Sequence, residues 1–112
     1  MKTYDQLLDA LGDPTRRSIV DLLAERPRSV AALARELPVS RPAVSQHLRI
    51  LADAGLVGYR RNGTRHVYRL EPRGLEPLRA WVDSMWDDVL RAYAEAIVED
   101  RPKKRDTKGD LR

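Results

Sequence analysis

The most informative absence in this 112-residue chain is cysteine, of which it has none. Disulfide bonds, thiolate metal ligands and a cysteine nucleophile are therefore excluded together. No apolar run approaches the roughly 20 residues that cross a bilayer. Acidic residues also occupy the N-terminal segment, where a signal peptide would be apolar. We therefore expect a cytoplasmic protein whose fold depends on packing alone.

The components of a catalytic site are also scarce. The chain contains two histidines, His47 and His66, and neither is spaced with a carboxylate as a catalytic dyad would require. It has no glycine-rich phosphate loop. We therefore expect no enzymatic activity and no cofactor. Its length suits one domain with a modest core.

Charge is distributed unevenly along the chain, although the net charge is only +4. Between Pro38 and Leu70, six arginines stand against a single acidic residue, Asp53, whereas residues 71–100 hold eight acids and three bases. A basic segment beside an acidic one suggests an anionic partner that meets one region, and nucleic acid is the default candidate. Charge alone is equally compatible with an ordinary solvated surface.

Helical patterns fill the first half of the chain. Residues 4–11 predict a short amphipathic helix that Gly12 ends as a C-cap. Asp13 is a favourable N-cap, so a second helix is expected over residues 14–25, the first of which is proline. Ser29 caps a third, shorter helix.

The segment SRPAVSQHLRIL, residues 40–51, predicts a fourth helix with two distinct faces. Its apolar stripe, at i, i+4 and i+7, consists of Val44, Leu48 and Leu51. The opposite face carries Pro42, Ser45, Gln46 and Arg49. A short turn at residues 37–39 separates this helix from the third one, which is the pattern of a helix-turn-helix.

The sequence LVGYRRNGTRHVYRL predicts a β-hairpin, because Asn-Gly is the strongest short signal for a hairpin turn. With Asn62 and Gly63 as the turn, we expect Tyr59 opposite His66. Alternation with a period of two then divides the hairpin into two faces. The expected core face holds Val57, Tyr59, His66, Tyr68 and Leu70, and the other face holds Arg60, Arg65, Val67 and Arg69.

A long helix is expected from about Leu75 to Ile97. The segment after it, residues 99–112, is densely charged, contains Pro102 and shows no periodicity, so we expect a disordered tail. The expected folded domain is therefore residues 1–98.

Three stretches of the chain resemble, in order, the ArsR family of bacterial repressors: ALGDPTRRSIVDLL, SVAALARELPVSRPAVSQHLRILADAGLV and YRRNGTRHVYRL. The resemblance covers roughly residues 4–97. It implies a mainly α fold with a small β-hairpin, the winged helix-turn-helix, in which the first and last helices form a dimer interface. It further implies a transcriptional regulator that binds double-stranded DNA, namely a homodimeric repressor on an imperfect palindromic operator, with its own promoter among the candidates.

The residue types on the fourth helix fit this function. A helix fits the major groove of B-DNA, where glutamine matches the adenine edge and arginine the guanine edge. Gln46 and Arg49, on the recognition helix of about residues 40–54, are therefore the candidates for base reading. The first turns of that helix favour phosphate, and the wing, about residues 56–70, can contact the backbone or the minor groove. The predicted DNA-contacting residues are Ser40, Arg41, Pro42, Ser45, Gln46, Arg49, Arg60, Arg61 and Arg65.

Other polar side chains receive different expectations. His47 lies about 60° from the core direction of its helix, so we expect it to be partly buried and hydrogen-bonded, with a DNA or metal role as the alternative. Arg16 and Arg17 are expected to be structural or interface groups. Arg28 and Ser29 are candidates for phosphate contact at the start of the third helix.

The last helix carries more apolar surface than a small domain can cover, which predicts a partner. The alternative is that this helix packs back on its own domain. In ArsR relatives the first and last helices form the homodimer interface, and the resemblance implies the same here. The predicted interface residues are Tyr4, Leu7, Leu8, Leu11, Leu78, Trp81, Val82, Met85, Trp86, Val89 and Tyr93.

Many ArsR relatives sense metals through two cysteines on the third helix, or through carboxylates and histidines on the last helix. Here Ser29 and Ala31 occupy the first place, and the last helix has aspartates without histidine. We therefore expect a metal-independent regulator, whose small-molecule effector the sequence does not identify. The remaining alternative is a dimeric protein-interaction module on the same scaffold, which steep salt dependence of DNA binding would exclude.

Overall fold

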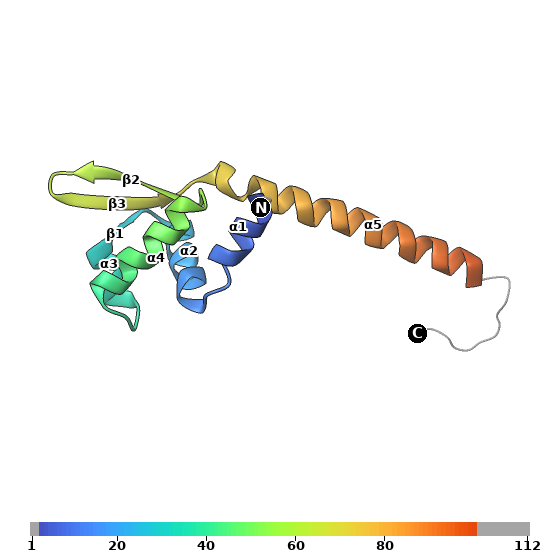
Figure 1. Cartoon of the computed structure of the whole chain (residues 1–112), viewed down its shortest axis with the longest axis horizontal. Coiled ribbons are helices and arrows are strands. Elements are labelled where there is room, and N and C mark those ends of the chain that lie inside the picture. The colour runs from blue at the N-terminus through green and yellow to red at the C-terminus, as the bar shows by residue number, and fades with distance from the viewer. Residues whose placement is uncertain (1–2, 101–112) are drawn as a thin grey trace. The chain divides into compact units, whose positions relative to one another are not determined.

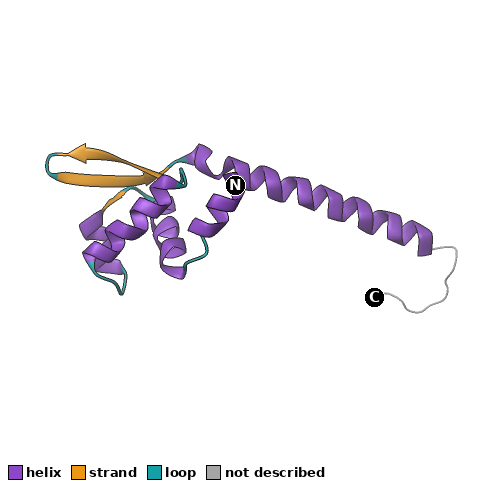
Figure 2. Ribbon diagram, in the orientation of Figure 1, coloured by secondary structure: helices purple, strands orange, loops and turns teal. Residues whose placement is uncertain are grey.

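The computed structural model describes residues 3–100, which form a mainly helical fold with one small antiparallel sheet (Figure 2). In chain order the elements are α1 (Thr3–Ala10), α2 (Pro14–Glu25), β1 (Arg28–Ser29), α3 (Val30–Glu36), α4 (Arg41–Asp53), β2 (Val57–Asn62), β3 (Arg65–Leu70), the 3-10 helix η1 (Pro72–Leu75) and α5 (Glu76–Asp100). The sheet has the strand order β1-β3-β2. Figure 1 shows α3 and α4 as the helix-turn-helix and the β2–β3 hairpin as its wing. The winged helix-turn-helix expected from the sequence is confirmed.

The chain divides into two compact units between Arg79 and Ala80. The first unit holds α1 to α4, the sheet, η1 and the first turn of α5, and the second unit contains the rest of α5. Because α5 extends to Asp100, it includes the first two residues of the expected tail. The remainder of that tail, residues 101–112, lies outside the described residues, and a single domain over residues 1–98 stays a prediction.

The junction between α1 and α2 is fixed by side chains of α2. Asp13 caps α2 by accepting a hydrogen bond from the Arg16 backbone N–H at 3.0 Å. Arg16 Nε donates to the Ala10 carbonyl oxygen at 2.6 Å, and Arg17 Nη1 donates to the Leu11 carbonyl oxygen at 2.8 Å. These cations therefore satisfy carbonyls that the end of α1 leaves without intrahelical partners. Both arginines are structural, as expected.

Gly12 does not end α1 in the way that the sequence suggested. Among the described residues, the glycines with positive φ are Gly55 and Gly63. Gly12 does follow α1 in a turn, where its N–H donates to the Asp9 carbonyl oxygen at 3.2 Å, but without the positive φ of a glycine cap. The arginine side chains of the next helix supply the remaining capping bonds.

The core of the first unit is aliphatic. Its most deeply buried side chains are Leu7, Ile19, Leu33, Val44, Leu48, Leu51 and Leu56. Each such leucine stabilises the fold by about 1.5–3 kcal/mol relative to an exposed one. Leu7, predicted for the dimer interface, therefore requires correction, because it is 0% exposed and belongs to this core. Its neighbour Leu8 is exposed and remains available.

Serine caps and a glycine fix the limits of the helix-turn-helix. Ser29 Oγ accepts from the Ala32 N–H at 3.1 Å and caps α3, and Ser40 Oγ accepts from the Ala43 N–H at 3.3 Å and caps α4. Gly55, with φ of +82°, turns the chain after α4. A left-handed φ of this kind suits glycine, which has no Cβ to clash.

The hairpin has the expected faces but not the expected turn. Asn62 pairs with Arg65, which leaves Gly63 and Thr64 as the turn residues. Gly63, with φ of +69°, is the turn residue with positive φ, whereas an Asn-Gly type I′ turn needs positive φ at both residues. The predicted pairing of Tyr59 with His66 is therefore wrong. Tyr59 pairs with Tyr68 instead, and because this partner is two residues away, the division into faces is unchanged.

Arg28 lies in β1, a two-residue strand that pairs with β3 and that the sequence did not predict. Its side chain is only 3% exposed. The guanidinium forms ion pairs with Glu36 and with Glu25, the latter at 2.7 Å, and its Nε donates to the Leu22 carbonyl oxygen at 3.2 Å. The expected phosphate contact by Arg28 is therefore wrong, because its donors are already bound inside the fold.

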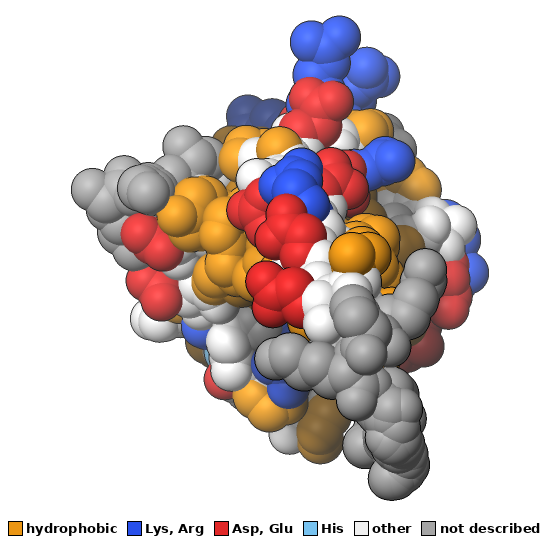
Figure 3. Space-filling model, turned by 90° about the vertical axis from the view of Figure 1, so that its right-hand side faces the viewer, with side chains coloured by type: hydrophobic (Ala, Val, Ile, Leu, Met, Phe, Trp, Pro, Cys, Tyr) orange, Lys and Arg blue, Asp and Glu red, His pale blue; other side chains and the backbone are white. Residues whose placement is uncertain are grey.

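Helix α5 presents a wide apolar face. In steps of 100° per residue, its large apolar side chains from Leu78 to Ile97 fall within an arc of about 180°. From Val82 onward these side chains are exposed, with Trp86 at 60% and Tyr93 at 67%. Figure 3 shows such exposed hydrophobic side chains beside acidic ones. Within residues 3–100, no helix has both the length and the apolar character of a membrane span.

Candidate nucleic-acid interface

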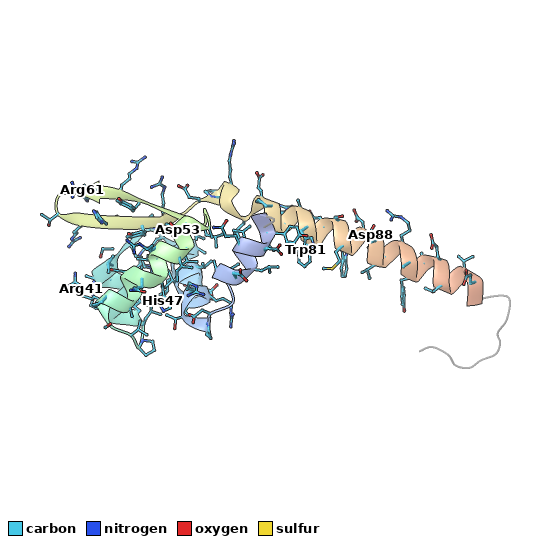
Figure 4. All side chains as sticks on the ribbon, viewed as in Figure 1. Arg41, His47, Asp53, Arg61, Trp81 and Asp88 are labelled. Atoms are coloured by element: carbon cyan, nitrogen blue, oxygen red, sulfur yellow. The ribbon has the colours of Figure 1, made fainter. Side chains whose placement is uncertain are left out.

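The buried side chains of α4 fix the direction of its polar face. Val44, Leu48 and Leu51 are 0% exposed, so they fix the rotation of the helix about its axis. Figure 4 shows Arg41 and Asp53 near the two ends of α4, and Arg61 on the hairpin. Every residue predicted to contact DNA is exposed to solvent: Ser40, Arg41, Pro42, Ser45, Gln46, Arg49, Arg60, Arg61 and Arg65.

The first turn of α4 can bind an anion while its cap remains in place. Ser40 Oγ accepts a backbone hydrogen bond through a lone pair, which leaves its O–H free to donate. Pro42 lies in this first turn, where a missing N–H costs little. The positive end of the helix dipole and the Arg41 guanidinium favour an anion at the same place.

A hollow of about 510 Å³ joins the start of α4 to the tip of the wing. It brings Arg41, Pro42 and Ser45 of α4 together with Arg65 of β3. Thr64, in the turn, and Ser29, at the start of α3, also line it. Residues from three parts of the chain therefore form one surface of hydroxyls and guanidinium groups.

A second hollow, of about 410 Å³, lies between the outward face of α4 and the hairpin. Its α4 wall contains Ser45, Gln46 and Arg49, the last two of which are the predicted base readers. Its hairpin wall contains Tyr59 and Tyr68, whose ring centroids are 5.2 Å apart. The recognition helix therefore has an aromatic neighbour beside it.

The three wing arginines do not form one cluster. Arg61 lies on the face of the hairpin that faces α4, where its Nε is 3.5 Å from His66 Nε2. Arg65 lines the hollow at the start of α4. Arg60 and Arg61 both line a separate hollow of about 450 Å³, together with Arg69 and Pro27. The structure therefore brings Arg65 near the start of the recognition helix and places Arg60 and Arg61 at a different hollow.

His47 is held at the side of α4, as expected of a partly buried residue. Its side chain is 20% exposed, and its Nδ1 lies 3.3 Å from Arg16 Nη1 and 4.0 Å from Asp13 Oδ2. Because arginine can only donate, Nδ1 is the acceptor in this contact. The backbone N–H of Arg16, which donates to the Asp13 carboxylate, lowers the pKa of this carboxyl from its ordinary value of 3.8, and partial desolvation opposes the effect without cancelling it.

Tyr59 is the residue of this surface that the sequence did not reveal. The alternation placed it on the core face, and it does lie on that face, but it is 52% exposed. Its cross-strand partner Tyr68 is equally far from the turn and on the same face, yet it packs against the core. Neither alternation nor distance from the turn could therefore have separated the two tyrosines.

Comparison with known proteins shows the family. Residues 13–59 match the family described as "Bacterial regulatory protein, arsR family". The chain is 53% identical over 100 residues to the HTH-type transcriptional regulator Rv2034 of Mycobacterium tuberculosis, an alignment that covers 87% of this chain and 94% of that protein. The chain belongs to the ArsR family.

Solved structures agree with this membership. A protein described as "Possible transcriptional regulator for arsenical resistance" is 48% identical, with a TM-score of 0.67, and the match covers 81% of this chain and 95% of that one. The homodimeric winged helix-turn-helix DNA-binding domain Mb0332 of Mycobacterium bovis is 33% identical, with a TM-score of 0.63, and the match covers 80% and 83%.

ArsR-family proteins are transcriptional regulators rather than enzymes, and they act on DNA through a winged helix. In this chain the winged helix contains α4, whose polar face is exposed, and the β2–β3 hairpin beside it. Within residues 3–100, no group of three or more histidine, cysteine, aspartate or glutamate side chains could hold a metal ion.

Proposed function

We propose that this ArsR-family protein is a homodimeric, metal-independent repressor that binds an imperfect palindromic operator. Gln46 and Arg49 read base edges in the major groove. The backbone is contacted by Ser40, Arg41, Pro42 and Ser45 on α4 and by Arg60, Arg61 and Arg65 on the wing.

The observation that carries this proposal is the contrast between the two faces of α4. Three aliphatic side chains at 0% exposure hold the helix, while the glutamine and arginine on its other face point to solvent. Glutamine can form two hydrogen bonds to the edge of adenine, and arginine can form two to the edge of guanine. The buried side of α4 fixes the direction of this polar face, and the two hollows beside the face leave room for a partner.

The apolar face of α5 supports the homodimer. An arc of about 180° is wider than the stripe that packs against a single neighbouring helix. The exposed side chains predicted for this interface are Leu8, Val82, Met85, Trp86, Val89 and Tyr93, and those that are partly buried are Tyr4, Leu11, Leu78 and Trp81. A two-fold dimer would place its recognition helices in successive major grooves, about 34 Å apart. That separation is the reason to expect a palindrome.

Metal independence is supported by the residues at the family's sensing positions. The chain has no cysteine, and Ser29 and Ala31 stand at the start of α3. Ser29 Oγ caps α3. A neutral serine hydroxyl is a poor substitute for a thiolate ligand.

Two arginine variants test the proposal. Binding of wild-type protein, Arg49→Ala and Arg65→Ala is measured on a duplex selected from a random pool and on unselected duplex, across a range of salt concentrations. Arg49→Ala should lose about 1–3 kcal/mol of discrimination between the two duplexes. Arg65→Ala should weaken binding to both and reduce the salt slope by about 1.

If both variants bind the selected duplex as the wild type does, the assignment of these surfaces is wrong. If the wild type binds no duplex in a salt-dependent way, the protein-interaction module becomes the better interpretation. Searching promoters for the recovered sequence then identifies the regulated genes.

A further inference from the structure

We propose that Tyr59 is a further DNA-contacting residue, whose hydroxyl donates a hydrogen bond to a phosphate of the strand that passes between α4 and the wing. This inference rests on the DNA binding proposed above. It adds a neutral donor to a surface that the sequence predicted to contact the backbone mainly through arginine.

The place of Tyr59 in the fold is the first observation. It lines the 410 Å³ hollow together with Ser45, Gln46 and Arg49 of α4. When a helix lies in the major groove, the two phosphodiester strands that border the groove run on either side of it. The wing stands on one side of α4, so the hollow between them is where one of those strands must pass.

The second observation is that the ring of Tyr59 is supported but not buried. It packs 4.6 Å from the His66 ring and 5.2 Å from the Tyr68 ring, measured between centroids. Even so, Tyr59 is 52% exposed, and its hydroxyl forms no hydrogen bond within residues 3–100. A rigid ring with a free donor loses little side-chain entropy when it binds a phosphate oxygen.

The two tyrosines of this hollow differ in a useful way. Tyr68 packs against the hydrophobic core, and burial raises the pKa of its phenol. Tyr59 is its cross-strand partner on β2, on the same face as Arg61, and is the more exposed of the two. Along β2 this face therefore changes from the buried Val57 to the Tyr59 hydroxyl and then to the Arg61 cation toward the tip.

Charge limits where the phosphate can lie in the hollow. Asp53, at the C-terminal end of α4, also lines it, and its carboxylate repels a phosphate. Ser45, Gln46 and Arg49 precede it on the helix. The strand is therefore expected at the end of the hollow that is away from Asp53, within reach of the Tyr59 hydroxyl.

The experiment compares Tyr59→Phe with Tyr68→Phe, which removes the same hydroxyl from the better buried ring. Both are measured by fluorescence anisotropy on the selected duplex and on unselected duplex at several salt concentrations. Both substitutions keep the ring and its packing, and thermal unfolding checks the fold. Tyr59→Phe should weaken binding about fivefold per protomer, or about 25-fold for a symmetric dimer, and equally on the two duplexes.

The salt slope distinguishes this contact from an arginine contact. A neutral hydroxyl releases no counterion, so Tyr59→Phe should leave the slope unchanged, whereas loss of a guanidinium contact lowers it by about 1. Tyr68→Phe should change the affinity by less than about twofold.

Three results would overturn the inference. If Tyr59→Phe binds both duplexes like the wild type, Tyr59 makes no such contact, although the DNA-binding function stands. If the loss falls on the selected duplex alone, Tyr59 reads a base and the phosphate assignment is wrong. If the wild type itself binds neither duplex, the proposed function fails first.

Discussion

Replacing Arg28 with methionine separates a structural arginine from a DNA-binding one. The sequence makes Arg28 a candidate for phosphate contact. In the structure, however, its side chain is 3% exposed and contacts Glu25, Glu36 and the Leu22 carbonyl oxygen. Methionine retains much of the apolar stem and removes the guanidinium. Arg28→Met should therefore destabilise the fold and leave DNA contacts unchanged.

The size of the effect follows from the three contacts. The bond from Nε to the Leu22 carbonyl oxygen contributes about 1 kcal/mol. The ion-pair partners Glu25 and Glu36 are 65% and 49% exposed, so solvent screens both pairs and each contributes less than about 1 kcal/mol. The sum is a loss of about 2 kcal/mol in the free energy of unfolding. For a chain of this length it lowers the Tm by roughly 10 °C.

The assay is thermal unfolding followed by circular dichroism, at one protein concentration because dimerisation shifts the apparent stability. DNA binding is then measured against salt, at a temperature where both proteins are folded. We expect a lower Tm and an unchanged salt slope. An unchanged Tm together with a slope reduced by about 1 would show that Arg28 faces phosphate, and would refute the structural role.

Two further predictions concern the dimer and the capping network. Trp86→Glu should raise the dimer dissociation constant by about 100-fold or more, because it places a carboxylate in the exposed apolar face of α5. The control Ser84→Glu, on the polar face of the same helix, should not change this constant. Sedimentation experiments measure both. Because the pKa of Asp13 is lowered, its carboxylate stabilises the fold at pH values above about 4, and this contribution is lost as the pH falls through the lowered value. Asp13→Asn keeps the N-cap but should make the Tm less dependent on pH in acid; an acid dependence equal to that of the wild type would contradict this role.

The sequence predicted the helix-turn-helix well because its signals are local. Ser40 caps α4 through an atom three residues away, and the stripe of Val44, Leu48 and Leu51 is a property of one helix. Neither signal depends on what lies elsewhere in the chain. The two faces of α4, on which the DNA-binding prediction depends, could therefore be identified without coordinates.

The hairpin turn was less predictable because two turns compete within the same four residues. Asn62-Gly63 can form a type I′ turn, whereas Gly63-Thr64 needs positive φ at its first residue only. The second arrangement places Tyr59 opposite Tyr68 and Val57 opposite Leu70. Cross-strand pairs of this kind stabilise a sheet, so packing between the strands, rather than the turn residues, decided the register.

Arg28 and Leu7 escaped prediction for a different reason. Two residues in a strand carry no periodicity, so β1 and the burial of Arg28 follow only from its pairing with β3. For Leu7, helical spacing showed that it belongs to an apolar side of α1 but not which neighbour covers that side. The structure assigns it to the chain's own core and leaves Leu8 exposed.

Arg16 illustrates contacts that no sequence pattern records. One guanidinium donates to the Ala10 carbonyl oxygen and lies 3.3 Å from His47, while the backbone N–H of the same residue donates to Asp13. The end of α1, the start of α2 and the side of α4 therefore meet at one residue. A recognition helix can present its polar face to DNA only if its other sides are held, and α4 is held by its leucines from behind and by His47 from the side. The direction of the polar face of α4 thus depends on contacts made by its other sides, and these contacts extend through Arg16 to the first helix of the chain.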